Sequence, residues 1–366
     1  MRVQFKTSYD TDIRLFKDRY QLAWYAVLGA TLIALPWLID VFMLGEITNV
    51  LIFAIAGMGL MILVGQTGQA SLGHAAFLAV GCYANVILQQ RAGLPFVVAF
   101  PLAGLISGVL GALIALPMVR LHGIYLAIAT LAMSVITEDI IIIAEPLTGG
   151  VGGLFAPDIS LFGYVINRYG DPAAFYWFTL AVTLFCVWIY RNLLRSPLGR
   201  AFAAVRDSEV SAQAMGVNVP KTKAIAFGVS TFITGLSGAI LGHYIGVFTP
   251  EAFNVLVSIQ LLLMIVVGGL GTIHGAFFGA LVIALLPTGI GMARDWLAAN
   301  VGLTTTAIPG LETATFGVIL IAFMLFEPMG LYGIWAKMRT YFELFPFYRQ
   351  GMFVRQKSYL KTERMR

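Results

Sequence analysis

The sequence has little charge: only 11% of its 366 residues are Asp, Glu, Lys or Arg, whereas 59% are hydrophobic. Soluble domains carry about 25% charged and 45–50% apolar residues. This shortage of charge, with a mean hydropathy of +0.87, excludes a soluble enzyme, a disordered chain and a nucleic-acid-binding module. At about 20 residues per membrane-spanning helix, there is room for about ten spans and for no large soluble domain.

Groups that carry catalytic or metal chemistry are also scarce. The two cysteines, Cys82 and Cys186, lie in apolar runs, which predicts neither a disulfide framework nor a zinc site. The four histidines lack the paired spacing of metal ligands. The segment Gly216–Thr222 resembles a phosphate loop, but Pro220 stands where that loop needs glycine. We therefore expect an enzymatically inactive chain that binds no metal, no ATP and no other cofactor itself.

Long apolar runs are what the sequence has instead. They cover residues 22–44, 47–64, 70–88, 94–117, 123–144, 173–190, 223–247, 255–270, 273–290 and 313–333. Lipid offers the backbone no hydrogen-bond partners, so each run is predicted to be a transmembrane helix. The expected fold is an all-α polytopic membrane protein with about ten spans. The polar residues 1–21 predict no cleavable signal peptide.

The positive charges predict the orientation of these spans. Ten spans place both termini on one side, and 20 of the 23 Lys and Arg residues then lie on that side. The other side holds only Arg91, Arg168 and Arg294. Because cytoplasmic loops are enriched in Lys and Arg, both termini are predicted to be cytoplasmic. The net charge of +5 thus reflects membrane insertion and not binding to nucleic acid.

Two segments far apart in the sequence resemble each other. Met61–Gly65 (MILVG) matches Met264–Gly268 (MIVVG), and after a glycine-rich break His74–Phe77 (HAAF) matches His274–Phe277 (HGAF). Both copies run in the same direction, which indicates a parallel internal repeat with substrate at the junction of its halves. Equally, small-residue helix starts look alike in many membrane proteins.

The break at Gly65–His74 is the most polar stretch between two spans. Non-helical backbone at membrane depth is tolerated only where protein buries it or a water-filled cavity hydrates it. Its side chains could therefore line a substrate path, or the segment could be a cytoplasmic turn with an N-cap at Ser71. We expect a cytoplasmic turn whose following helix start faces a cavity.

A second glycine-rich segment lies on the outer side, in the loop from Glu145 to about residue 172. Four glycines occur between positions 149 and 153, beside Thr148. Glycine permits tight turns next to a ligand or a neighbouring helix, although a flexible connector has the same composition.

Loop 191–223 is the longest predicted cytoplasmic connection. Its residues 200–215 are rich in alanine, which predicts one or two short helices that end at Gly216. The apolar side of such a helix needs a cover. A partner subunit could supply it, with Arg206, Asp207 and Glu209 fixing the register. Lipid headgroups could do the same for an interfacial amphipathic helix.

The motifs of this chain resemble those of permeases of bacterial branched-chain amino-acid ABC importers. The resemblance is carried by PLGR (197–200), RDSE (206–209), AMGVN (214–218), GQASLGHAAF (68–77), LHGIYLAIATLA (121–132), LTGG (147–150), VGGLGTIHG (267–275) and FEPMGL (326–331). These blocks span most of residues 55–333 in order. The extra N-terminal helix and the long loop 191–223 resemble the M-type permease more than the H-type.

The resemblance implies a type II-like importer permease in the bacterial inner membrane. It implies a second permease subunit, two cytoplasmic ATPases that bind ATP and Mg, and a periplasmic binding protein. Residues 200–216 would dock on an ATPase. The implied regions are an N-terminal segment 1–21, a permease domain 22–333 and a basic tail 334–366. The predicted ATPase-coupling residues are Arg200, Arg206, Asp207, Glu209, Met215 and Gly216.

The chain departs from the family pattern at two positions. Val135 and Gln260 stand where the family usually has Glu, and a carboxylate at membrane depth is an expensive group normally kept for a purpose. Branched-chain or other hydrophobic amino acids are the leading substrates, with urea, short amides and small aromatic or carboxylate solutes as alternatives. A stand-alone carrier or channel is the competing class. The predicted path residues are Gln66, Gln69, Ser71, His74, Tyr125, Thr130, Thr148 and Gln260.

Overall fold

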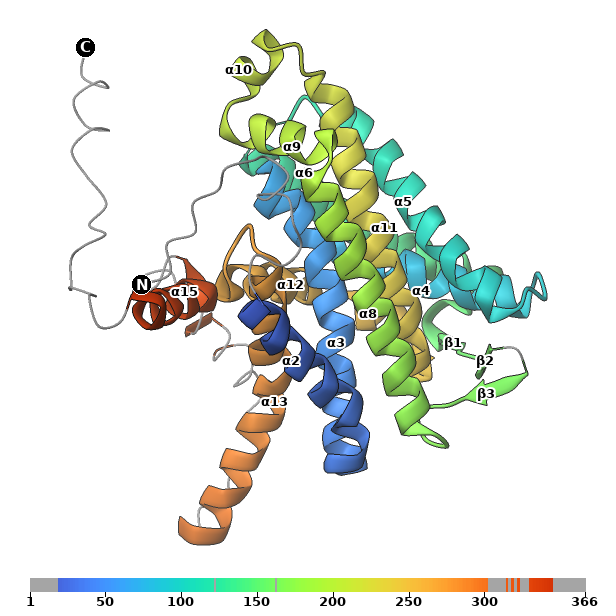
Figure 1. Ribbon diagram of the computed structural model, residues 1–366. Helices are drawn as coiled ribbons and strands as arrows, with labels where there is room; N and C mark the ends of the chain where they lie inside the picture. The colour runs from blue at the N-terminus through green and yellow to red at the C-terminus, as the bar shows by residue number, and fades with distance from the viewer. Residues whose placement is uncertain are drawn as a thin grey trace.

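The described part of the protein is a bundle of helices with four short strands at one end (Figure 1). The computed structural model describes residues 19–121, 123–161, 163–301, 314, 317–318, 321–322 and 329–344. The long helices are α2 (Arg19–Leu38), α3 (Val41–Met61), α4 (His74–Gln90), α5 (Phe96–Met118), α6 (Ile124–Ile143), α8 (Pro172–Arg195), α11 (Val219–Ile245), α12 (Val255–Gly268), α13 (Ile273–Val301) and α15 (Gly330–Leu344). The shorter ones are η1 (Ile62–Gln66), α7 (Glu145–Thr148), η2 (Gly150–Gly152), α9 (Pro197–Asp207), α10 (Glu209–Ala214) and η3 (Pro250–Phe253).

Seven helices in the described ranges are long and apolar enough to cross a membrane. They are α3 with η1, α5, α6, α8, α11, α12 with η3, and α13 up to Met292. The predicted runs 22–44 and 70–88 correspond mainly to α2 and α4, which are not among these seven helices. Most of the run 313–333 lies outside the described residues. The all-α polytopic fold is thus confirmed, and the count of ten spans stays a prediction.

Three boundaries differ from the sequence prediction. The first two helices separate at residues 39–40 and not at 45–46, because α3 already begins at Val41. Helix α13 continues to Val301, where the apolar run ended at 290. Helix α15 crosses the predicted boundary at 334. Residues 1–18 and 345–366, which make up most of the two predicted terminal segments, lie outside the described residues.

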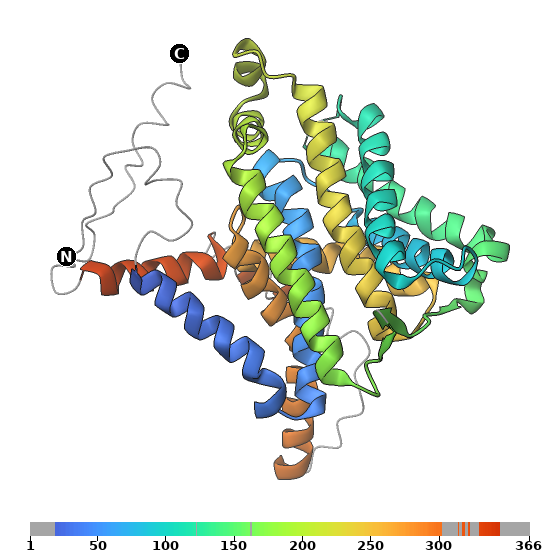
Figure 2. The same cartoon turned by 45° about the vertical axis from the view of Figure 1, so that its right-hand side comes forward.

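Helices α3 and α11 form the centre of the bundle, as the two views in Figures 1 and 2 show. In both, 78% of the most apolar 18-residue window is buried, against 28–44% in the other spanning helices. Ser230 and Ser237, two turns apart on α11, donate hydrogen bonds of 2.6 Å to the carbonyls of Gly59 and Ile52 on α3. In a membrane such polar contacts between helices contribute about 0.6 kcal/mol each.

Glycines allow the backbones of α4 and α5 to pack directly against α11. A Cβ on Gly81 of α4 would lie 2.1 Å from the carbonyl oxygen of Gly235 on α11, and one on Gly238 would lie 2.0 Å from that of Leu78. A Cβ on Gly111 of α5 would meet Thr231 of α11 at the same range, 2.1 Å. Small residues allow this close approach, which supplies the dispersion contacts that hold helices together in lipid.

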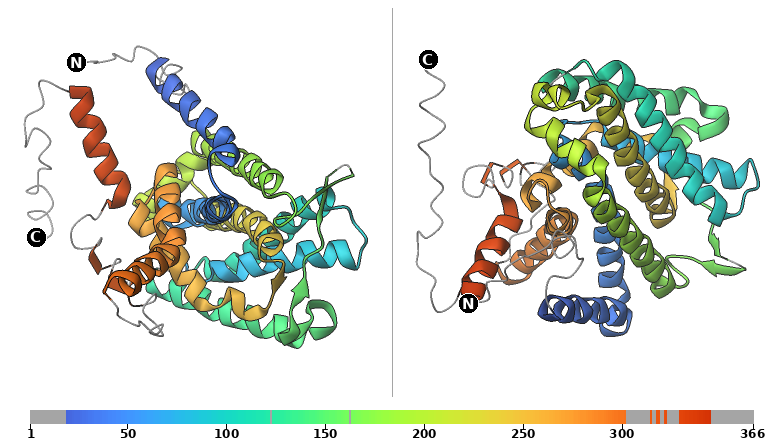
Figure 3. Two further views of the ribbon diagram at one scale, coloured as in Figure 1. Left: turned by 90° about the horizontal axis from the view of Figure 1, so that it is seen from below. Right: turned by 45° about the horizontal axis from the view of Figure 1, so that its top comes forward.

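Loop 191–223 folds into two helices, as predicted, at one end of the bundle (Figure 3). These two helices and the following α11 each begin at a side chain that accepts a hydrogen bond from a backbone N–H three residues later. The capping residues are Ser196 for α9, Ser208 for α10 and Asn218 for α11. Such caps satisfy N–H groups that have no partner within the helix. Proline follows two of them, at positions 197 and 220, where its missing N–H costs nothing.

The strands lie at the opposite end of the bundle from α9 and α10 (Figure 1). Strand β1 (Leu154–Phe155) pairs with β4 (Val247–Phe248), and β2 (Ile159–Leu161) forms a hairpin with β3 (Tyr164–Ile166), both antiparallel. The hydroxyl of Tyr164, in β3, donates to Asp171, the N-cap of α8. This hydrogen bond, with that from the Ala174 N–H, holds the pKa of the carboxyl below its usual value.

The glycines between positions 149 and 153 allow the chain to turn and to pack against strand β4. Gly149, Gly150 and Gly153 all have positive φ angles, between 56° and 74°. A Cβ on Gly153 would lie 2.3 Å from the carbonyl oxygen of Phe248. The cluster therefore permits a close approach to strand β4, where the sequence had indicated a ligand or a helix.

The glycine contacts generate a prediction for stability. Replacing Gly238 by Ala forces α4 away from α11, because the added methyl group meets a backbone carbonyl. We expect a loss of about 1–3 kcal/mol, typical of overpacking, seen as a lower unfolding temperature of the purified protein in detergent. The matched control is Gly29→Ala in α2, where nothing lies within 4 Å. Equal melting of both variants would contradict the packing argument.

Candidate functional site

The polar break after α3 lies among α8, α11 and the segment between α12 and α13. Helix α3 continues as the single π-helical segment η1, and Gly68, with a φ of 69°, ends it. Short π-helical segments occur often at functional sites. The chain then runs without regular structure to His74, where α4 begins. The exposed backbone groups of this break need partners, since lipid supplies none.

A hydrogen-bonded chain through His74 supplies part of this support. The Ser71 hydroxyl lies 2.9 Å from His74 Nδ1, and His74 Nε2 lies 2.8 Å from Ser230 Oγ on α11. Ser230 uses its own hydrogen on the Gly59 carbonyl, so it accepts from Nε2–H and Ser71 donates to Nδ1. This assignment rests on the network. His74 is fully buried and links the break to two helices.

Backbone N–H groups at the start of α4 are satisfied from two other helices. Thr130 of α6 accepts from the N–H of Leu72, and Ser258 of α12 accepts from that of Ala75, both at 2.9 Å. A Cβ on Gly73 would lie 2.2 Å from the Thr130 carbonyl oxygen. Side chains of α6 and α12 thus do for α4 what a local cap does elsewhere.

The two breaks of the possible internal repeat touch each other. Gln66 donates to the Tyr190 hydroxyl of α8 at 3.1 Å and to the carbonyl of Gly271, between α12 and α13, at 2.9 Å. A Cβ on Gly65 would lie 2.7 Å from the Gly271 nitrogen. Both segments show the same succession of helix, glycine-containing break and helix, and the internal repeat stays a prediction.

Five of the eight predicted path residues therefore gather at the break. Gln66, Gln69, Ser71, His74 and Thr130 are all buried, between 0% and 8% exposed. They bond to protein groups, with Gln69 donating to Thr67. The expectation that the start of α4 faces a cavity is wrong for this conformation, since these side chains close the break.

The other three predicted path residues lie elsewhere. Thr148 is buried at the end of the bundle where the strands lie, and it accepts from the Gly150 N–H. Tyr125 is 72% exposed on α6, and Gln260 is half-buried on α12, two residues after Ser258. A role in translocation stays a prediction for all eight residues.

Sequence reasoning missed the partners Tyr190, Ser230 and Ser258. A signal existed for Ser230, because Ser230, Thr234 and Ser237 recur on one face of an apolar run, the pattern of polar contacts between membrane helices. Tyr190 carries no such signal. Within the described ranges, no three His, Cys, Asp or Glu side chains gather as metal ligands do.

Loop 191–223 is tied to the break by Arg206. Its Nη1 donates to the Gly65 carbonyl at 3.3 Å, while Nε and Nη2 contact Asp207. The Arg206 Cγ lies 3.2 Å from where a Cβ of Gly68 would be. Helix α9 therefore rests directly on the end of η1.

A buried ion pair fixes α10 on α11. Lys223 Nζ lies 2.7 Å from Glu209 Oε1, and the lysine side chain is only 3% exposed. Gly216, with a φ of 86°, ends α10, as predicted: its N–H bonds to the Gln213 carbonyl and that of Val217 to the Ala212 carbonyl. This is the Schellman pattern of helix ends.

The surface of this loop is only partly apolar. Phe202 and Val205 of α9 are buried inside this chain, so they need no partner or lipid to cover them, contrary to the sequence argument. Val210 and Met215, by contrast, are 80% and 85% exposed. Of the other predicted coupling residues, Arg200 and Asp207 are exposed as well.

Known proteins place these features in a family. Residues 42–326 match the family described as "Branched-chain amino acid transport system / permease component". The high-affinity branched-chain amino acid transport system permease proteins LivM of Salmonella typhimurium and of Escherichia coli are each 30% identical over 274 residues. This match covers 69% of the present chain and 64% of each relative.

Other relatives are more distant. The probable branched-chain amino acid transport permease protein LivH of Methanocaldococcus jannaschii is 26% identical over 79% of this chain and 91% of its own. The ribose import permease protein RbsC of Haemophilus influenzae is 27% identical over 68% and 77%. No solved structure matches. The chain is thus a multi-pass membrane protein that belongs to the family of branched-chain amino acid transport system permease components.

Proposed function

We propose that this chain is the permease subunit of an ATP-driven importer that moves branched-chain or other hydrophobic amino acids across the bacterial inner membrane. A second permease, two cytoplasmic ATPases that bind ATP and Mg, and a periplasmic binding protein complete the transporter. Both termini and loop 191–223 face the cytoplasm, in line with the distribution of Lys and Arg. The substrate class is supported by the LivM relatives, which are named as branched-chain amino acid permeases.

One contact carries the proposal: the hydrogen bond from Arg206 to the Gly65 carbonyl. It joins the exposed helices of loop 191–223 to the break that closes the bundle. A displacement of α9 therefore acts first on the end of η1, and through Gln66 on the second break at Gly271. An ATPase that moves this loop would bias the break between closed and open arrangements.

The translocation path runs along the exposed face of α6, between this chain and the second permease. The face of α6 that packs into the bundle carries Thr130, Ser134 and Thr137, which are buried. The outward face carries Tyr125 and Asp139, both exposed. Asp139 lies near the end of α6, and a carboxylate within a membrane span usually faces water or another protein group and not lipid, so water or a partner subunit on this face is favoured.

Reconstitution tests the function. Proteoliposomes that contain this chain, the second permease and both ATPases are expected to take up leucine only with ATP and the binding protein. Arg206→Ala is expected to retain ATP hydrolysis but to lower uptake at least tenfold, because α9 no longer holds the Gly65 carbonyl. Arg206→Lys, which keeps a cationic donor, should restore part of the uptake.

Two results would overturn this function. Uptake by the chain alone, without an ATPase, would identify a stand-alone carrier or channel. ATP-driven uptake of ribose, urea or a short amide, with none of leucine, would retain the importer class and refute the amino-acid substrate.

The docking surface makes a separate prediction. Val210→Asp with Met215→Asp is expected to reduce co-purification of the ATPase at least tenfold, because both exposed apolar side chains would be lost from the contact. The fold should survive, since neither side chain is buried. Val151→Asp is the matched control: this valine is 65% exposed at the outer end. Unchanged co-purification of the double variant would place the ATPase elsewhere.

The path along α6 is tested by filling it. Ala132 lies on the exposed face between Tyr125 and Asp139, and Ala132→Trp is expected to lower uptake at least tenfold while the complex still assembles. The control is Leu184→Trp on α8, a position that is 58% exposed. Full transport by the Ala132→Trp complex would exclude this face from the path.

A further inference from the structure

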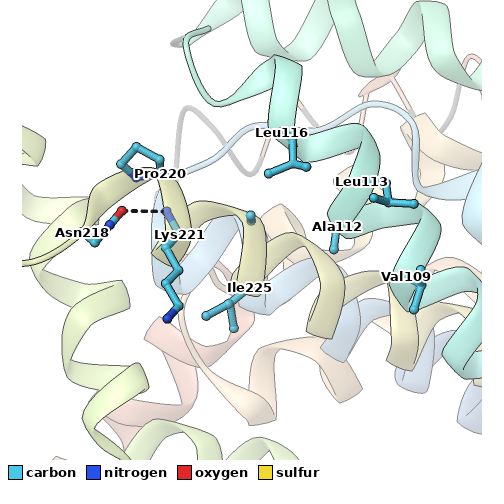
Figure 4. A pocket seen from close by; sticks show the side chains of 9 residues that line it. Val109, Ala112, Leu113, Leu116, Asn218, Pro220, Lys221 and Ile225 are labelled. Atoms are coloured by element: carbon cyan, nitrogen blue, oxygen red, sulfur yellow. Dashed lines mark hydrogen bonds between the residues drawn. The ribbon is translucent and has the colours of Figure 1, made fainter.

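A groove lies between α5 and α11, away from the break and from the exposed face of α6 (Figure 4). It has a volume of about 510 Å³. Its walls are formed by Val109, Ala112, Leu113, Leu116, Asn218, Pro220, Lys221, Ala224 and Ile225. Figure 4 shows the α5 side chains on one wall, with Lys221 and Ile225 extending from α11 on the other. The proposed function uses none of these residues.

The packing of the two helices orients the groove. Gly104 contacts Leu236, Gly108 contacts Phe232, and Gly228 contacts Ala112, so α5 and α11 run antiparallel. The groove opens beyond the last of these contacts, at the end of both helices where α9 and α10 also lie (Figure 1). It is thus a furrow along two spanning helices that ends at a membrane border.

The walls of the groove are apolar and face outward. Val109, Leu113 and Leu116 are 58%, 55% and 61% exposed. The groove runs lengthwise along two spanning helices. Water in the groove would hydrate these apolar side chains at a cost in free energy, whereas a hydrocarbon chain would not. A soluble subunit bound to α10 has no comparable access to residues this far along α5.

The end of the groove is positively charged. Lys221 is exposed at its mouth, and Arg120 is exposed two residues beyond the end of α5. Neither has an ion-pair partner among the residues that the structure describes. The neighbouring acid Glu209 is already paired with Lys223. An occupant with a hydrocarbon chain and an anionic head therefore matches both the walls and the mouth.

We propose that this groove binds an anionic phospholipid, with one acyl chain along α5 and α11 and the phosphate at Lys221. The lipid would occupy the leaflet next to loop 191–223. It would pack against the first turns of α11, the helix to which Glu209 attaches α10.

Lipid retention by the full-length purified chain tests the proposal. The protein is placed in nanodiscs of phosphatidylcholine and phosphatidylglycerol in equal amounts, released, and analysed by native mass spectrometry. The wild type is expected to retain phosphatidylglycerol in at least threefold preference. Lys221→Gln should abolish most of this preference, and Lys221→Arg should keep it. Leu113→Trp, which fills the groove from its exposed wall, should reduce retention of the lipid itself.

Arg200→Gln is the matched control, because it removes an exposed charge from the same end of the protein. It should leave the preference unchanged. Equal retention of both lipids by the wild type, or an equal loss in Arg200→Gln and Lys221→Gln, would overturn the proposal in favour of general surface charge. Loss of bound lipid when the second permease is co-expressed would assign the groove to that subunit instead. Size-exclusion profiles verify that each variant is folded.

Discussion

The structure depends on one constraint: the backbone between α3 and α4 leaves the helical conformation in the interior of a bundle of membrane helices. Its polar groups have to be satisfied by protein, because hydrocarbon cannot do so. Three helices supply the partners, through Ser230 of α11, Thr130 of α6 and Ser258 of α12. The position of each helix relative to the others follows from this shared obligation at least as much as from apolar packing, which is not directional.

The sequence predicts the parts of this protein that follow from local chemistry. Apolar runs, the two helices of loop 191–223 and the helix stop at Gly216 are all readable, because each depends on neighbours along the chain. The polar break was recognised as unusual for the same reason. Its state was not: whether His74 faces water or Ser230 depends on a helix more than 150 residues away, and no local pattern encodes that distance.

The same limit explains the errors in loop 191–223. The alanine-rich residues 200–215 indicated a helix whose apolar side needed a cover, but the sequence could not distinguish Phe202, which the chain buries itself, from Met215, which it leaves exposed. Likewise, Arg206 and Glu209 looked like contacts for another subunit. In the structure they first connect the loop to Gly65 and Lys223. A side chain that holds its own loop in place can still contact a partner subunit, since these bonds use only some of its polar atoms.

The glycine contacts have a mechanical consequence. Where a methyl group cannot fit between two backbones, the helices can neither rotate nor slide past each other without separating, and interiors packed so closely transmit displacement instead of absorbing it. Helices α4, α5 and α11 therefore behave as one stiff block. A displacement of α9, which touches the end of η1 through Arg206, would therefore be passed on to this block as a whole.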